Sequence, residues 1–165
     1  MFTALRPILY VQVSPERLTV RNAKSGKVIS EVPEMATSSG TKKTILAVGA
    51  EARLAASTQA AEIVNPFRHP RTLLGDFTVG EQLLRAFVRR LQGNKPLALA
   101  PLIVMHPLGS PEGGFTQVER RAFREMALGA GASEVVLWVG RELSDSEVLS
   151  QHVLQSEERG SEREA

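Results

Sequence analysis

The stretch at residues 116–135, TQVERRAFREMALGAGASEV, carries the clearest fold information in the chain. Thr116, followed three positions later by Glu119, is a capping box, which predicts that a helix begins here. Gly129 predicts where that helix ends, and the run at 134–139 predicts a strand directly after it. Apolar residues at helical spacing predict its buried stripe: Val118, Ala122, Phe123 and Met126.

On both sides of this unit the pattern continues. The nearly continuous apolar run at 97–105 predicts a strand buried on both faces, and the glycine-rich segment 109–114 predicts a loop. Ser144 and Glu147 form another capping box, which predicts a last helix. We expect this helix to fold back over the sheet as a lid through one apolar side, formed by Val148, Leu149 and Val153.

Upstream lies the most regular helical pattern of the chain. Thr78 and Glu81 predict a capping box, Asp76 is expected to cap or turn into the helix, and Gly93 is a plausible stop. The apolar face of the predicted helix is made of Val79, Leu83, Leu84, Phe87, Val88 and Leu91.

The N-terminal part contains short strand patterns separated by turn residues. Residues 8–13, 17–22 and 27–32 predict a β-meander, and the polar stretch 33–43 predicts a loop. The expected order beyond it is a strand at 44–48, a short helix at 50–56, an extended piece at 61–65 and an irregular piece at 66–71.

This order predicts an α/β fold with a mixed sheet and flanking helices, because strands joined through helices pair in parallel. We expect one lobe over residues 1–155. Its core spans 1–32 and 77–155, with a small inserted subdomain at about 33–76 and a disordered charged tail at 156–165.

Composition narrows the classes of function. The 165 residues carry a net charge of +2, too small a surplus to favour nucleic acid as a partner. The absence of cysteine excludes disulfides and thiolate chemistry. No apolar run approaches the roughly 20 residues of a membrane helix, so we expect a cytoplasmic location.

The motif Thr-Gln-Val-Glu-Arg-Arg-Ala at 116–122, followed by Gly-Ala-Gly-Ala-Ser-Glu-Val at 129–135, closely resembles the MreB family of bacterial actin-like, rod-shape-determining proteins. Supporting matches are Ala47-Val48-Gly49, Asn65-Pro66-Phe67-Arg68 and Asp76-Phe77. The resemblance implies the first of two lobes of an actin-like fold, with a ribonuclease-H-like core. Members of the family polymerise on ATP, lie on the inner membrane and guide cell-wall synthesis.

The chain departs from this family where nucleotide is handled. The first phosphate loop of the family, Asp-Leu-Gly-Thr, is replaced by Gln12-Val13-Ser14-Pro15, which lacks the acidic residue, the glycine and one backbone N–H. The family pattern Glu-Glu-Pro is replaced by Val139-Gly140-Arg141, and the sequence ends before the second phosphate loop and the adenosine pocket. We therefore expect no enzymatic activity, no catalytic residue, no metal and no cofactor.

The leading hypothesis is a nucleotide-free interaction module that contacts a full-length actin-like filament protein, the cell-shape machinery or a second copy of itself. Arg120, Arg121 and Arg124 are the candidate partner-binding residues, and the alternative is that they are ordinary solvated charges of a helix. A competing hypothesis is a residual ATP-binding subunit that completes its site with a partner, with Ser14 touching a phosphate.

Other candidate sites are weaker. His69, His106 and His152 have no ligand spacing, and we expect His106-Pro107 to end a strand. The 109–114 loop could hold an anion at a helix N-terminus, but it lacks the Lys-Ser/Thr pair of a P-loop. Membrane contact through the first residues is not expected, because Pro7 limits a helix there to about one turn.

Overall fold

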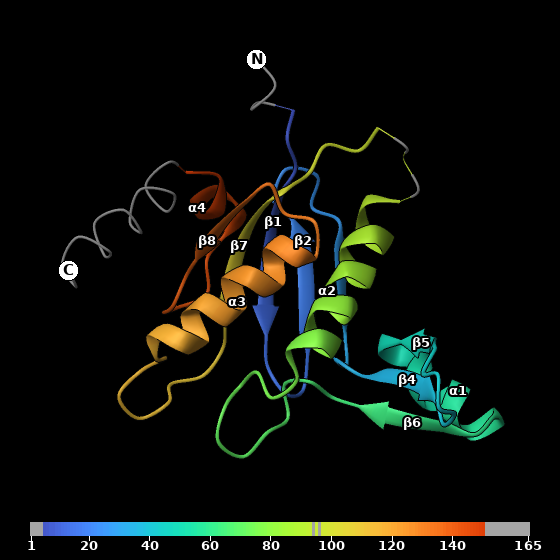
Figure 1. Ribbon diagram of the computed structural model, residues 1–165. Coiled ribbons are helices and arrows are strands. Elements are labelled where there is room, and N and C mark those ends of the chain that lie inside the picture. Colours follow the sequence, from blue (N-terminus) through green and yellow to red (C-terminus); the bar gives the residue numbers. More distant parts are fainter. Residues whose placement is uncertain (1–4, 94, 96, 151–165) are drawn as a thin grey trace.

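The computed structural model describes residues 5–93, 95 and 97–150, and in them the chain forms two sheets (Figure 1). The larger sheet has five strands in the order β3-β2-β1-β7-β8, and the smaller has three in the order β5-β4-β6. The strands of the larger sheet are β1 (Ile8–Val13), β2 (Leu18–Asn22), β3 (Val28–Glu31), β7 (Leu102–Pro107) and β8 (Glu134–Leu137).

The larger sheet is mixed, as the element order predicts. β1 is antiparallel to β2, and β2 to β3, which confirms the meander. β1 is parallel to β7 and β7 to β8, because helices return the chain across the sheet between these strands. All six residues of β7 are buried, so this strand lies at the centre of the fold.

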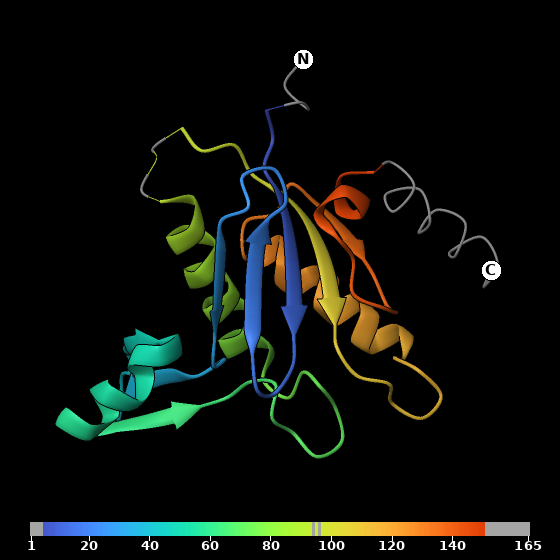
Figure 2. The same cartoon turned by 180° about the vertical axis from the view of Figure 1, so that it is seen from behind.

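Two long helices, α2 (Phe77–Gln92) and α3 (Gln117–Gly129), cover one face of this sheet (Figure 1). The view from behind in Figure 2 shows the strands in front of these helices, with α4 (Asp145–Leu149) on the opposite side near β8. The core between the helices and the sheet includes the fully buried Leu9, Val11, Leu83, Phe87, Ile103 and Phe123. The second face is covered by Leu143 and Val148, which pack with Tyr10, Leu102, Val104 and Val136.

The smaller sheet, with α1 (Ala52–Thr58), lies to one side of the larger one (Figure 1). It consists of β4 (Met35–Ser38), β5 (Ile45–Val48) and β6 (Ala61–Val64), and the 3-10 turn η2 (Gly49–Glu51) precedes α1. Glu31 connects the two parts: it accepts hydrogen bonds from Arg90 on α2, at 2.7 and 3.1 Å, and from the backbone of Ala50, at 2.9 Å. The Arg90 guanidinium is the main reason that the pKa of the Glu31 carboxyl is lowered.

Several local predictions were wrong. Leu149, predicted on the buried side of the last helix, is 39% exposed, and β8 ends at Leu137 rather than at residue 139. The predicted loop 33–43 contains β4, the central strand of the smaller sheet, because Met35 and Ala36 find full burial there. The cap of α2 is Asp76, whose carboxylate accepts from the Val79 N–H at 3.0 Å, and not the pair Thr78 and Glu81. The remaining two concern the start of β7 and one residue of the α3 stripe. β7 begins at Leu102 rather than at residue 97, and Val118 on α3 is 78% exposed instead of buried.

Candidate functional site

The carboxyl ends of the three parallel strands β1, β7 and β8 meet at one edge of the larger sheet. In open α/β sheets, ligands bind at this edge, in the loops that follow the strands. The loops here are the β1–β2 turn at 14–17, the segment 108–116 and the segment 138–144. Each of these three loops could present groups that bind a ligand.

The β1–β2 turn is hydrogen-bonded within itself. The N–H of Ser14 donates to the Arg17 carbonyl at 3.0 Å. The Ser14 hydroxyl oxygen accepts from the N–H groups of Glu16 and Arg17, at 3.3 and 3.1 Å. Pro15 has no N–H, and its carbonyl accepts from the Asn65 side chain at 2.8 Å. Every backbone N–H of the turn that could contact a phosphate therefore already has a partner.

The start of α3 is likewise occupied by a carboxylate of the chain. Glu119 accepts from the N–H of Thr116 at 2.8 Å, and the Thr116 hydroxyl oxygen accepts from the Glu119 N–H at 3.2 Å. This confirms the predicted capping box. Thr72 donates to the same carboxylate at 3.0 Å, and these contacts lower the pKa of Glu119, with the Thr116 N–H as the main cause. The carboxylate of Glu119 thus provides a negative charge of the chain's own at the positive end of the helix.

A buried polar network lies under the segment 138–144. His106 is 1% exposed, and its Nδ1 lies 2.6 Å from the Tyr10 hydroxyl while its Nε2 lies 3.0 Å from the Gly140 carbonyl. A carbonyl can only accept, so Nε2 carries the proton and a neutral ring accepts at Nδ1 from Tyr10. The Tyr10 oxygen in turn accepts from the Leu143 N–H at 3.1 Å. The network ties β1 and β7 to the segment 138–144.

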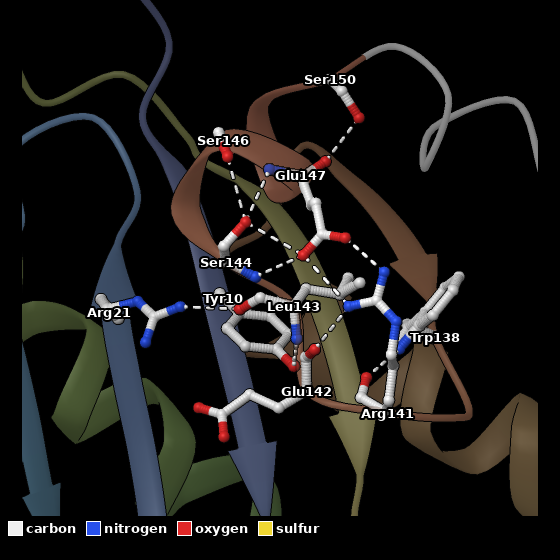
Figure 3. Close-up of polar contacts among 10 residues, drawn as sticks. All are labelled: Tyr10, Arg21, Trp138, Arg141, Glu142, Leu143, Ser144, Ser146, Glu147 and Ser150. Atoms are coloured by element: carbon white, nitrogen blue, oxygen red, sulfur yellow. Dashed lines mark hydrogen bonds and ion pairs between the residues drawn. The ribbon is translucent and has the colours of Figure 1, made fainter.

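Figure 3 shows the polar contacts above this network. Glu147 closes the second capping box with Ser144, as predicted, and forms an ion pair with Arg141. The Arg141 guanidinium, followed by the Ser144 N–H, lowers the pKa of Glu147 to about 2. Arg21 donates to the Leu143 carbonyl at 3.1 Å, pairs with Asp145 at 2.7 Å, and places its guanidinium 5.2 Å from the centre of the Tyr10 ring.

The three candidate arginines of α3 lie away from this edge network and in different surroundings. Arg120 is exposed and donates from Nε to the Phe115 carbonyl at 3.3 Å, whereas Arg124 is half-buried. Arg121 is exposed, and it shares the outer face of α3 with Glu125 and with two exposed apolar residues, Val118 at 78% and Leu128 at 44%. Their role in partner binding stays a prediction.

The family model described as MreB/Mbl protein matches residues 15–141 of this chain. The chain belongs to the MreB/Mbl family. Among curated relatives, it is 38% identical over 99 residues to the cell shape-determining protein MreB of Haemophilus influenzae, and 36% identical over 101 residues to that of Escherichia coli. Each match covers 59% of this chain and 27% of the relative, so the match spans about a quarter of the relatives' length.

Solved structures confirm the actin-like, α/β fold of this MreB-type lobe. MreB5 of Spiroplasma citri bound to ADP superposes with a TM-score of 0.62 at 19% identity, over 81% of this chain and 38% of that one. A non-polymerising MamK mutant bound to AMPPNP superposes with a TM-score of 0.64 at 15% identity, over 81% of this chain and 41% of that one. None of the helices in the described part of the chain combines the length and apolar character needed to cross a bilayer.

Sequence reasoning missed the Tyr10–His106 pair and its link to Arg21. The available signal was a histidine inside an apolar strand and a tyrosine in the neighbouring strand pattern, both with side chains on the same face of the sheet. Their proximity depends on β1 pairing with β7, two strands separated by most of the chain. His152 and the predicted tail lie outside the described residues.

Proposed function

We propose that this MreB-type lobe is a nucleotide-free interaction module of the bacterial cell-shape cytoskeleton, which binds an actin-like partner through the outer face of α3. The observation that carries this proposal is the exposed pattern on that face. Val118, Arg121, Glu125 and Leu128 recur at intervals of three and four residues, so their side chains form one stripe along the helix. The two apolar side chains are exposed on the same face as one charge of each sign, and this combination is what supports a contact surface there.

The stripe is complementary to itself. If a second α3 lies antiparallel to the first about an axis beside residue 123, Val118 faces Leu128 of the other copy and Arg121 faces Glu125. A two-fold contact requires this reciprocity, in which one patch meets an identical patch. The helix motif is shared with MreB relatives, which supports a full-length family member as an equally suitable partner.

The arrangement of the β1–β2 turn supports the nucleotide-free part of the proposal. A phosphate loop presents free N–H groups to its ligand, whereas Ser14, Glu16 and Arg17 use theirs within the turn. The alternative, a residual ATP-binding subunit, is favoured by the nucleotides bound to the structural neighbours MreB5 and MamK. Calorimetry with Mg-ATP separates the two: binding tighter than about 100 μM, roughly 5.5 kcal/mol, would reject the nucleotide-free reading.

Charge reversal tests the contact surface. Arg121→Glu and Glu125→Arg each place like charges opposite one another, so each single variant should weaken self-association in analytical ultracentrifugation. The double variant restores opposite charges across the two-fold axis and should recover association. Arg89→Glu makes the same charge reversal at an exposed position on α2, away from the stripe, and serves as the matched control. Loss in both single variants without recovery in the double variant would contradict the two-fold contact.

A full-length partner is tested separately by pull-down with the MreB protein of the same cell. Arg121→Glu should lower the captured amount, while Arg89→Glu should leave it unchanged. No capture by the unmodified chain, together with no self-association, would refute the proposed function.

A further inference from the structure

The segment 138–149 keeps its shape largely through contacts within itself. The Trp138 indole N–H donates to the Arg141 carbonyl at 2.8 Å, Arg141 pairs with Glu147, and the Ser144 capping box closes the start of α4. These bonds do not depend on the sheet below. The segment can therefore move away from the sheet as a unit without breaking them.

Fewer polar bonds tie this segment to the larger sheet. Two of them involve the buried network: His106 donates from Nε2 to the Gly140 carbonyl, and the Leu143 N–H donates to the Tyr10 hydroxyl oxygen. Arg21 adds its contacts with Leu143 and Asp145. The backbone N–H of Trp138 donates to the Met105 carbonyl at 2.8 Å. Among these groups, only histidine has an ordinary pKa that lies between pH 5 and 8, so the His106 ring is the group whose charge can respond to pH in this range.

We propose that His106 is a pH-dependent switch. Its neutral ring holds the segment 138–149 over the sheet. Protonation of the ring releases the segment and uncovers the apolar face beneath it. The hydrogen-bond chain is complete only for the neutral ring. Adding a proton at Nδ1 removes the acceptor of the Tyr10 hydroxyl and places a charge at a position that is 1% exposed. The face that becomes accessible carries Tyr10, Leu102, Val104 and Val136.

The charged groups around the ring decide how strongly it resists protonation. Tyr10 on β1 contacts the ring directly, and Arg21 on β2 places a positive charge over the Tyr10 ring. A protonated His106 would be a second positive charge in this region. From the segment, Glu142 favours the protonated ring, while Arg141 and Glu147 pair with each other and Asp145 pairs with Arg21. Burial outweighs these attractions and keeps the pKa of His106 below its ordinary value of 6.5. The closed form is therefore fully favoured above pH 6.5 and loses stability as the pH falls below it.

Amide hydrogen exchange of the intact chain at pH 7.5 and 5.5, corrected for intrinsic exchange, measures the opening directly. Burial lowers the pKa of His106 in the closed form, so opening of 138–149 should rise as the pH is lowered from 7.5 to 5.5. An ordinary pKa of about 6.5 in the open form limits this rise to about tenfold. The amides of α2 should change by less than twofold. Trp138, the sole tryptophan of the chain, should report the same transition in its fluorescence.

Two variants assign the effect to one ring. His106→Gln keeps an N–H donor for the Gly140 carbonyl but does not titrate, so its exchange in 138–149 should be independent of pH. His69→Gln alters an exposed histidine and should show the same rise as the unmodified chain. A rise below twofold in the unmodified chain, or an equal rise in α2, overturns the proposal even if His106→Gln fails to fold. Persistence of the response in a folded His106→Gln variant overturns it as well.

Discussion

Val148 provides a direct measure of how firmly α4 closes the second face of the sheet. Its side chain is fully buried against a cluster that includes Tyr10, Val104 and Leu143. Val148→Ala removes two methyl groups, which costs about 1.6 kcal/mol at ~0.8 kcal/mol per buried carbon, before any cost of the cavity. With the cavity included, we expect a loss of about 2–3 kcal/mol in the free energy of unfolding.

For a chain of 165 residues, this corresponds to a fall in Tm of about 4–12 °C, at roughly 2–4 °C per kcal/mol. Thermal and urea unfolding followed by circular dichroism measure both quantities. Val118→Ala is the matched control, since the same atoms are removed from a helix at a side chain that is 78% exposed. Its effect should stay within about 0.5 kcal/mol. Equal stability of the two variants would refute the packing of α4 on the sheet.

Three other changes give separate tests of the fold. Deleting residues from Ser144 onward should lower the Tm and increase binding of an apolar dye, and an unchanged Tm would mean that this part covers nothing. Glu147→Gln should flatten the acid dependence of stability: the lowered pKa of about 2 stabilises the folded state above pH 4.5, and this contribution is lost as the pH falls from 4.5 toward 2. Comparing urea midpoints across that window measures the loss, and identical profiles would contradict it. Gly49→Ala should destabilise by about 2 kcal/mol or more in urea unfolding, because its φ is +68° and a Cβ would collide with the Glu31 carboxylate. Gly40→Ala, whose Cβ would meet nothing closer than 3.9 Å, should be nearly neutral, so equal effects of the two would contradict this reading.

Most of the fold could be predicted because its elements carry local signals. Residues close together in the sequence determine the capping boxes at Thr116 and Ser144 and the apolar face of α2. β4 escaped prediction because Met35-Ala36-Thr37-Ser38 has little strand preference of its own. Its strand conformation comes from pairing with β5 and β6, which lie later in the chain.

The candidate site was less predictable for the same reason. The departure of Gln12 and Pro15 from the family's phosphate-loop motif is visible in the sequence, and the loss of nucleotide binding that it suggests stays a prediction. The network that ties Tyr10 to His106 joins residues 96 positions apart, and no local pattern links them. The exposure of Val118 was also missed, since helical spacing shows which residues share a face but not which neighbours cover it.

The symmetry of the α3 stripe has a consequence for the size of any assembly built on it. Two chains that meet through an identical patch consume that patch on both sides, so the contact closes at a dimer and cannot propagate. If this chain binds the corresponding helix of a filament subunit, it covers the lateral surface of that subunit. Its own matching surface is then also buried, so no further subunit can bind there. Such a molecule would inhibit lateral association of filaments stoichiometrically, one copy for each blocked subunit, and would not extend the assembly.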